Sequence, residues 1–337
     1  MKSLPTVTTF SDDQSHEKKD QHEAYGTLIA QAVDVMEIDV GWTRSKQLWR
    51  PLMARGVFGG QVVAQALMAA CKTVESHFSL HSLHSYFILA GDNQIPILYQ
   101  VERIRDGKTY ATRVVKASQR GRVIFSASFS FAVAEPGISF EHQIPMPKVP
   151  SPESLPSEDE RVEEVLKHPD LEIPEKYRTY LQQRLQEKAP IDYREVHVPT
   201  VQELARLTPI KSDRQQVWFK CHGTLNDDPV LHQAVLAYAS DAYLLHTAVR
   251  TSGLQRTEIG MMASLDHTMW LHAPFRADEW LLYDMDSPRA TNGRGLCFGR
   301  IYRQDGTLVA STAQEGIIRL SLRSQEKRRQ KTKESKM

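Results

Sequence analysis

The segment that decides the fold spans residues 59–74 and reads GGQVVAQALMAACKTV. Its apolar residues recur every three to four positions, at 62–63, 66–67, 70–71 and 74, which is the one-sided stripe of an amphipathic helix. The glycine pair Gly59-Gly60 marks the start of that helix. A helix with one apolar stripe has to bury it against another layer, so we expect a sheet to cover it.

Strand-like runs surround this helix. One run precedes it at residues 35–42, and four follow it at residues 80–89, 97–105, 109–118 and 123–132. Tight-turn signals at Asp106-Gly107 and Arg120-Gly121 join the last three runs into an antiparallel meander. The predicted order of this half is strand, long helix and meander.

The second half of the chain repeats this order. A strand at 215–223 and a helix at 230–249 precede four strands at 262–271, 280–285, 295–302 and 307–320. The repeat points to an internal duplication. Because a sheet wrapped around one long helix is the hot-dog architecture, the predicted fold class is α+β, a double hot-dog.

The stretch between the halves has a different composition. Residues 136–190 hold nine of the seventeen prolines, so they cannot continue a sheet and are predicted to be a linker, with one possible helix at about 174–187. The predicted divisions are a disordered extension (1–25), an N-terminal hot-dog domain (26–135), this linker, a C-terminal hot-dog domain with the catalytic residues (191–322) and a basic tail (323–337).

Composition excludes several function classes. The 42 Lys and Arg residues balance the 41 Asp and Glu residues, which gives no reason to expect a nucleic-acid partner. Cys71, Cys221 and Cys297 lie far apart, so a structural zinc site is not expected. Gly293-Arg294-Gly295 is not a dinucleotide fingerprint, and no apolar run is long enough to span a membrane. We therefore expect a soluble intracellular chain without metal or cofactor.

Candidate chemistry lies in residues 263–275 and 310–318. Ser264, Asp266, His267 and Gln314 are polar groups in otherwise apolar strands. Burial without a partner would cost about 1–3 kcal/mol for each group, so they should bond to one another, to backbone or to a ligand.

Individually these residues have ordinary explanations. By helix geometry, Asp241 at the margin of an apolar stripe is either a solvated charge or a half-buried base, and margins favour the former. Ser264 lacks the Gly-x-Ser-x-Gly elbow of an α/β-hydrolase. Asp266 and His267 are interpreted mainly as structural residues that bond neighbouring strands.

Six segments carry a more specific signal when taken together: GVFGGQ (56–61), LHSYF (83–87), YASD (238–241), SLDHTMW (264–270), HAPFR (272–276) and AQEG (313–316). In order and spacing they resemble the acyl-CoA thioesterase II family, and most nearly its peroxisomal members. The resemblance covers residues 26–318, apart from the linker. It implies hydrolysis of fatty acyl-CoA to free acid and CoA by a trio that falls on Asp241, Ser264 and Gln314.

The chemistry explains why the resemblance needs these residue types. A held water attacks an activated thioester carbonyl directly if Asp241 orients it or takes its proton, Ser264 relays the hydrogen bond and Gln314 donates an N–H. Backbone N–H groups at Gly59 and Gly60 are further candidate oxyanion donors. The rival is a covalent acyl-Ser264 with His267 as base, but residues three apart in a regular strand point to opposite faces.

Two other function classes remain as alternatives. Residues 91–96, GDNQIP, superficially resemble a hot-dog enoyl-CoA hydratase motif, although the Asn-Pro pair and a partner histidine are absent. A non-catalytic acyl-CoA binding protein is the second alternative, and the complete trio argues against it.

The end of the chain predicts a location. Ser335, Lys336 and Met337 resemble a peroxisomal signal of the Ser-Lys-Leu type, which would bind a peroxisomal import receptor. We accordingly expect the peroxisomal matrix, and we also expect exposed sheet edges to allow a homo-oligomer.

Overall fold

The structure, a computed structural model, describes residues 28–52, 54–135, 137, 140–205 and 208–334. The predicted disordered extension at 1–25 and the predicted targeting residues Ser335, Lys336 and Met337 lie outside the described residues.

The first half follows the predicted order, after helical residues 28–33. Its elements are β1 (Val35–Asp39), β2 (Trp42–Ser45), α2 (Gly59–Cys71), β3 (Ser79–Phe87), β4 (Leu98–Asp106), β5 (Tyr110–Gln119) and β6 (Arg122–Ala132). Helix α2 packs on β4, β5 and β6, and ten of its thirteen residues are buried, so the apolar stripe lies where the pattern placed it.

The second half repeats the helix and the meander. Its elements are β7 (Ile191–Glu195), α5 (Val201–Leu204), β8 (Arg214–Cys221), α6 (Pro229–Ser240), α7 (Leu244–Thr251), η2 (Arg256–Glu258), β9 (Ile259–Ser264), β10 (Asp266–Leu271), β11 (Leu281–Thr291), β12 (Arg294–Arg303) and β13 (Leu308–Leu320). Helix α7 packs on β8, β11, β12 and β13.

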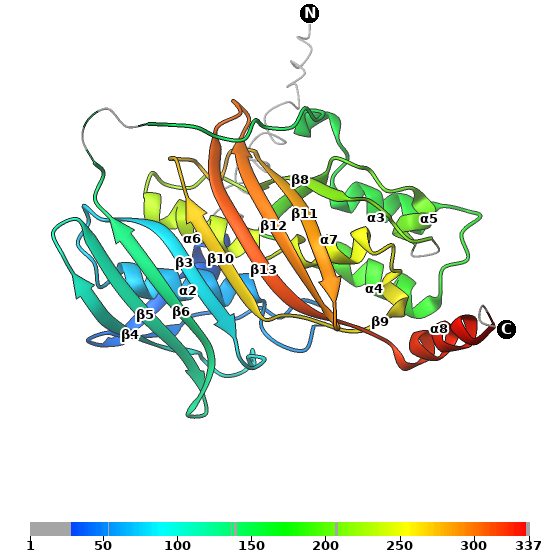
Figure 1. The fold of residues 1–337 in the computed structure, drawn as a ribbon, viewed down its shortest axis with the longest axis horizontal. Helices are drawn as coiled ribbons and strands as arrows, with labels where there is room; N and C mark the ends of the chain where they lie inside the picture. Colours follow the sequence, from blue (N-terminus) through cyan, green and yellow to red (C-terminus); the bar gives the residue numbers. More distant parts are fainter. Residues whose placement is uncertain (1–27, 53, 136, 138–139, 206–207, 335–337) are drawn as a thin grey trace, which may run out of the picture.

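One antiparallel sheet joins the two halves. Its strand order is β1-β2-β4-β5-β6-β3-β10-β13-β12-β11-β8-β7, and β9 also pairs with β13. The junction is the pairing of β3 with β10, in which His84 lies opposite Thr268 (Figure 1). The fold is therefore a double hot-dog, as predicted, with both curved halves belonging to one continuous sheet.

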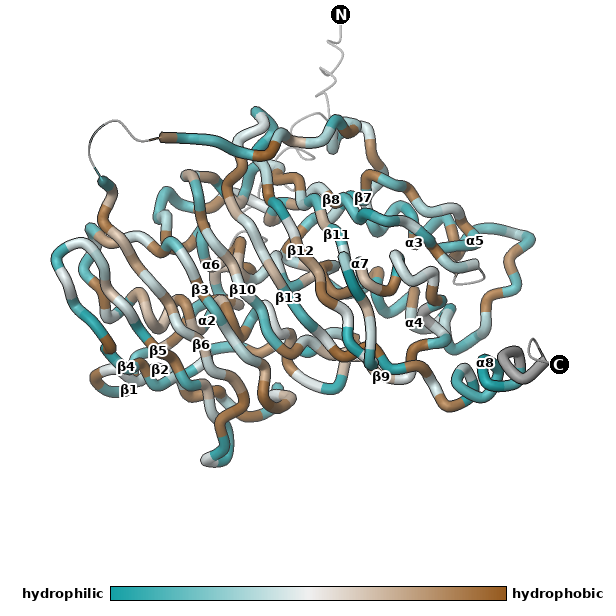
Figure 2. Tube along the Cα trace, in the orientation of Figure 1, coloured by the Kyte–Doolittle hydropathy of each residue, from teal (hydrophilic) through white to brown (hydrophobic). Residues whose placement is uncertain are grey.

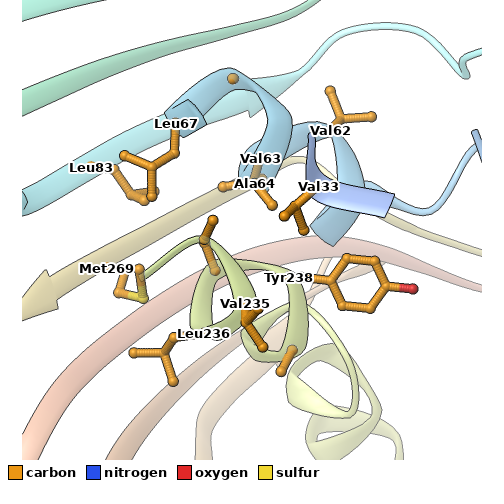
Figure 3. Packing of buried hydrophobic residues seen from close by; sticks show 14 of the residues in the cluster. Val33, Val62, Val63, Ala64, Leu67, Leu83, Val235, Leu236, Tyr238 and Met269 are labelled. Carbon is orange, nitrogen blue, oxygen red and sulfur yellow. The ribbon is translucent and has the colours of Figure 1, made fainter. Parts of the chain in front are cut away.

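The helices α2 and α6 lie side by side under this sheet and run in opposite directions. A Cβ atom on Gly60, at the start of α2, would lie 2.2 Å from the carbonyl oxygen of Tyr238, near the end of α6, so this close approach requires glycine. Figure 3 shows side chains of both helices meeting, together with Leu83 of β3 and Met269 of β10. A single hydrophobic core consequently extends through both halves.

The predicted linker contains more structure than its composition suggested. Besides the expected helix, α4 (Glu175–Gln186), it holds η1 (Pro152–Ser154) and α3 (Glu158–Lys167). Helices α3, α4 and α5 share a small apolar cluster of their own. The extended part crosses the outside of the sheet, where Trp218 donates its ring N–H to the carbonyl of Pro150 at 2.9 Å. The prolines suit this extended path because it needs no strand pairing.

Three predicted elements are each divided in two. Residues 35–42 are not one strand, because the chain turns at Gly41 (φ 73°) between β1 and β2. Residues 230–249 are not one helix, because α6 ends at Ser240 and α7 begins at Leu244. Residues 262–271 are not one regular strand, because β9 and β10 are separated at Leu265. The second and third divisions lie beside the candidate catalytic residues.

The predicted basic tail begins as a helix, α8 (Leu322–Glu334), in which Arg328 forms an ion pair with Glu258 at 3.0 Å. Figure 2 shows α8 as a mostly hydrophilic helix. Among the described residues, no helix has the length and apolarity needed to cross a membrane.

Candidate active site

Asp241 is held at the C-terminal end of α6. The helix is interrupted directly after it, because Tyr243 adopts a left-handed conformation (φ 65°) that is uncommon for a bulky residue. Two of the last carbonyl groups of the helix accept tyrosine hydroxyls, and that of Ala239 also accepts the backbone N–H of Ala242. Tyr193 donates to the carbonyl of Ala239 at 3.4 Å, and Tyr283 donates to the carbonyl of Ser240 at 3.0 Å. Asp241 therefore projects from a fixed helix end.

Ser264 lies at a β-bulge. Ser264 is opposite Gly316 on β13, whereas Thr268 is opposite Ala313, so the β9–β10 side contains one extra residue. An extra residue shifts the alternation of side chains by one position beyond it. Ser264 and His267 consequently point to the same side, and the prediction that they face opposite sides is wrong.

The predicted trio converges in the structure. The Gln314 amide nitrogen lies 2.6 Å from Ser264 Oγ and 3.1 Å from Asp241 Oδ1, and Ser264 Oγ lies 3.5 Å from that same carboxylate oxygen. The three side chains come from α6, β9 and β13. Gln314 is 1% exposed, while Asp241 and Ser264 are partly exposed, so the donor is shielded and the carboxylate and hydroxyl can meet a ligand.

The other half of the chain contributes the N-terminus of α2. A Cβ atom on Gly59 would lie 2.6 Å from Asp241 Oδ2, so the start of this helix directly faces the carboxylate. Its N-cap residue, Phe58, makes no side-chain hydrogen bond to the first turn. The first N–H groups of a helix have no intrahelical partners and attract negative charge. Gly59 and Gly60 thus lie where donors for an oxyanion would be needed.

The sequence did not predict the contacts of two residues beside the trio: Ser240, and His267, which was considered only as a base for Ser264 or as a strand-bonding residue. His267 Nδ1 lies 2.9 Å from Gln314 Oε1, and His267 Nε2 lies 2.9 Å from Ser240 Oγ. The signal that could have found them was the polar pair Ser240-Asp241 at the end of an apolar helix. Asp266, in contrast, has the strand-bonding role predicted for it, because it accepts the backbone N–H of Glu315 at 2.8 Å.

Three tyrosines lie at the end of α6: Tyr238 within the helix, Tyr243 just after it, and Tyr193, which bonds the carbonyl of Ala239. Burial raises the pKa of Tyr193, Tyr238 and Tyr243 above the ordinary value, so their hydroxyls remain neutral at physiological pH. The Tyr238 ring packs edge to face against Phe58, with the ring centroids 4.9 Å apart. Within the described part of the chain, no group of three or more His, Cys, Asp or Glu residues is arranged to hold a metal ion.

The hydratase-like segment 91–96 lies in the loop between β3 and β4, where it has a structural role. The Asp92 carboxylate forms an ion pair with Arg120 at 3.1 Å, and its backbone N–H donates to Gln119 Oε1 at 2.8 Å. These bonds tie the loop to the hairpin between β5 and β6. The segment has neither the motif nor the partner of a hydratase site.

Comparison with known proteins gives consistent matches. A family model described as acyl-CoA thioesterase matches residues 186–317, and one described as the acyl-CoA thioesterase N-terminal domain matches residues 47–132. The chain is 40% identical over 294 residues to acyl-coenzyme A thioesterase 8 of Mus musculus, covering 87% of this chain and 89% of that protein. It is 26% identical over 305 residues to peroxisomal acyl-coenzyme A thioester hydrolase 1 of Saccharomyces cerevisiae, covering 80% and 87%.

A solved structure matches as well. The acyl-CoA thioesterase II of Mycobacterium marinum superposes with a TM-score of 0.68 at 39% sequence identity, over 87% of this chain and 99% of that one. The match spans both hot-dog halves, so the pairing of the halves is common to the two proteins.

Proposed function

The chain belongs to the acyl-CoA thioesterase II family, and we propose that it hydrolyses fatty acyl-CoA by direct attack of a water held by Asp241, Ser264 and Gln314. Acyl-CoA thioesterase activity follows from membership of the family. The observation that carries the finer proposal is the convergence of the three side chains, within 2.6–3.5 Å of one another, at the N-terminus of a helix from the opposite half.

The proposed reaction needs one base and correct placement of the water. Asp241 accepts a proton from the water, whose oxygen forms a bond to the thioester carbon; the C–S bond then breaks, and the CoA sulfur leaves as a thiolate that takes up a proton. Ser264 and Gln314 hold the water in line with the carbonyl carbon, which lowers the entropy cost of the attack. The thioester is already activated, so a nucleophile stronger than an oriented water is not required.

The carbonyl oxygen gains negative charge during the attack. The N–H groups at Gly59 and Gly60 are preorganised donors for that charge, because the helix N-terminus favours an anion and the N-cap residue Phe58 makes no side-chain hydrogen bond to it. In this proposal, one half of the chain supplies the base and the other half supplies the oxyanion donors.

The geometry favours water attack over an acyl-serine intermediate. The rival in which His267 is the base for Ser264 is disfavoured, because the two ring nitrogens of His267 contact Ser240 and Gln314. Ser264 itself accepts the Gln314 N–H at 2.6 Å. A covalent acyl adduct on Ser264, detected by intact-protein mass spectrometry after rapid quenching, would contradict the proposed mechanism.

Release of CoA thiol from a panel of saturated acyl-CoAs tests the function. The native chain should release thiol, and Gln314→Ala should lower kcat by about 10²–10³-fold, the usual loss for one preorganised donor. Gln304→Ala makes the same change at an exposed residue in the turn just after β12 and should leave turnover unchanged. Stoichiometric binding of acyl-CoA by the native chain without thiol release would support the binding-protein alternative, and loss of an enoyl double bond without thiol release would support the hydratase.

We also propose that the enzyme acts in the peroxisomal matrix. The S. cerevisiae relative is named as a peroxisomal protein, and Ser335, Lys336 and Met337 resemble a peroxisomal signal that an import receptor would bind. A fluorescent reporter carrying residues 323–337 should colocalise with a peroxisomal marker. The same reporter without Met337 should remain diffuse, and punctate fluorescence in both cases would show that the tripeptide is not the signal.

A further inference from the structure

We infer that His267, held by Ser240, is a positioning residue that fixes the orientation of the Gln314 side-chain amide, so that its N–H groups and not its oxygen face Ser264 and Asp241. The inference rests on the proposed role of Gln314 in the hydrolysis. It adds two residues, neither of which belongs to the trio, and assigns each an atom and a direction of hydrogen bonding.

The three groups form a chain that is closed to solvent. Ser240 and His267 are fully buried, and Gln314 is 1% exposed. The contacts are 2.9 Å from Ser240 Oγ to His267 Nε2 and 2.9 Å from His267 Nδ1 to Gln314 Oε1. At this depth an unsatisfied polar atom would cost about 1–3 kcal/mol, so each contact has to join a donor to an acceptor.

Chemistry fixes the direction of each bond. The amide oxygen of Gln314 can only accept, so His267 Nδ1 has to carry the hydrogen. In a neutral imidazole the other nitrogen is then an acceptor, so the Ser240 hydroxyl donates to Nε2. The carbonyl of Ala237, 3.1 Å from Ser240 Oγ, is the competing acceptor for that hydroxyl. Because the Gln314 amide nitrogen lies toward Ser264 and Asp241, the neutral tautomer of His267 that fits this arrangement is the one with hydrogen on Nδ1.

The tautomer of His267 and the orientation of the Gln314 amide are coupled. If the hydrogen were on Nε2, Nδ1 would become an acceptor and would favour the amide nitrogen at its side. The amide would then be reversed, and its oxygen would lie where the nitrogen is now, 2.6 Å from Ser264 Oγ and 3.1 Å from the Asp241 carboxylate oxygen. The amide oxygen would then repel the Asp241 carboxylate oxygen, because both only accept, and although the Ser264 hydroxyl could turn to donate to it, the N–H donor toward the water would be lost. The tautomer of His267 therefore decides whether Gln314 can function.

His267 is a positioning residue and not a catalytic one. The structure gives it contacts with Ser240 and Gln314, and both ring nitrogens are used. The bulge at Ser264 and Leu265 brings the ring to this side of the strand. A regular strand would have turned His267 away from Gln314.

Two substitutions separate positioning from simple packing. In His267→Asn the side-chain amide nitrogen can take the place of Nδ1 and donate to Gln314, whereas in His267→Gln the longer amide reaches the place of Nε2 and Ser240. If His267 positions Gln314, His267→Asn should retain at least about tenfold more kcat than His267→Gln, with KM changed by less than about threefold in both. If His267 only fills space or anchors α6, the two variants should have equal kcat or the reverse order.

His272 provides a matched control. It lies just after β10, is exposed, and makes one comparable bond, to Ser311 Oγ at 2.9 Å. The Asn and Gln variants at His272 should have equal kcat, close to that of the native chain. A difference there as large as at His267 would overturn the inference, because it would show that the order of the variants does not report on Gln314.

A second measurement does not depend on turnover. Long-range ¹H–¹⁵N correlation spectra of the native chain labelled with ¹⁵N-histidine, with the His267 signals assigned by their loss in His267→Asn, should show hydrogen on Nδ1 at neutral pH. Hydrogen on Nε2 would overturn the inference whatever the activity. If the native chain released no thiol but carried the Nδ1 hydrogen, the proposed function would fail while the orientation of the amide would stand.

Discussion

Asp241→Asn is expected to lower kcat for thioester hydrolysis by about 10²–10⁴-fold, the usual contribution of a general base. Asparagine has almost the same shape, and its oxygen can still accept the Gln314 N–H that now lies 3.1 Å from Asp241 Oδ1. The substitution therefore removes proton acceptance and negative charge while it preserves the hydrogen bond. Initial rates of thiol release under saturating acyl-CoA measure the effect on kcat.

Asp228→Asn is the matched control on the same helix. Asp228 is the N-cap of α6 and accepts the N–H of Val230 at 3.0 Å, and asparagine is an equally good N-cap. This variant makes the same change of charge at the opposite end of α6, so native turnover and native stability are expected. If Asp241→Asn kept native turnover, Asp241 could not be the base, and the proposed mechanism would have to be abandoned.

Glu195→Gln is expected to lower the free energy of unfolding by about 3–5 kcal/mol, because it leaves buried positive charge without a counter-charge. Glu195, on β7, pairs with Arg161 of α3 at 3.3 Å and also with Arg250 of α7. The Glu195 and Arg161 side chains are 8% and 3% exposed, so water screens the pair little. Urea unfolding followed by tryptophan fluorescence, with the midpoint and slope fitted separately, measures the change.

An exposed ion pair within α3 supplies the comparison. Glu163 bonds Lys167 at 2.6 Å, with side chains 51% and 75% exposed, and such a pair contributes at most about 0.5 kcal/mol. Glu163→Gln should thus unfold at nearly the native urea midpoint. Equal midpoints for the Glu195 and Glu163 variants would show that the attachment of α3 to β7 and α7 does not depend on this buried charge.

The order of strands and helices could be predicted because it depends on local patterns. The stripe of α2 and the turn glycines Gly107 and Gly121 are visible in any short window of sequence. Helix α3 was missed because its apolar residues are few and lie between prolines; its stabilising cluster with α4 and α5 exists only after the chain has folded back on itself. Strand β7 was missed as well, because it is short, lies at the edge of the sheet and carries charged residues.

The site was harder to predict because it depends on two departures from regular structure. Helical periodicity continues past Asp241, and nothing local indicates that Tyr243 adopts a left-handed conformation. Period-two alternation likewise continues through Ser264 and Leu265, although the pairing of β9 and β10 with β13 places a bulge there. Family resemblance supplied the trio, but it gave no reason to connect His267 with Gln314.

The antiparallel pairing of α2 and α6 creates two helix ends that have become chemically different. At one end Asp241 faces the open N-terminus at Gly59. At the other end α6 begins with Pro229, which has no N–H, and burial raises the pKa of the Cys71 thiol to about 12. If the two halves descend from identical subunits, as their repeated element order suggests, a mutation in such a dimer would alter both ends at once, whereas in a single chain each end can change alone. One end can then stay reactive while the other serves packing only.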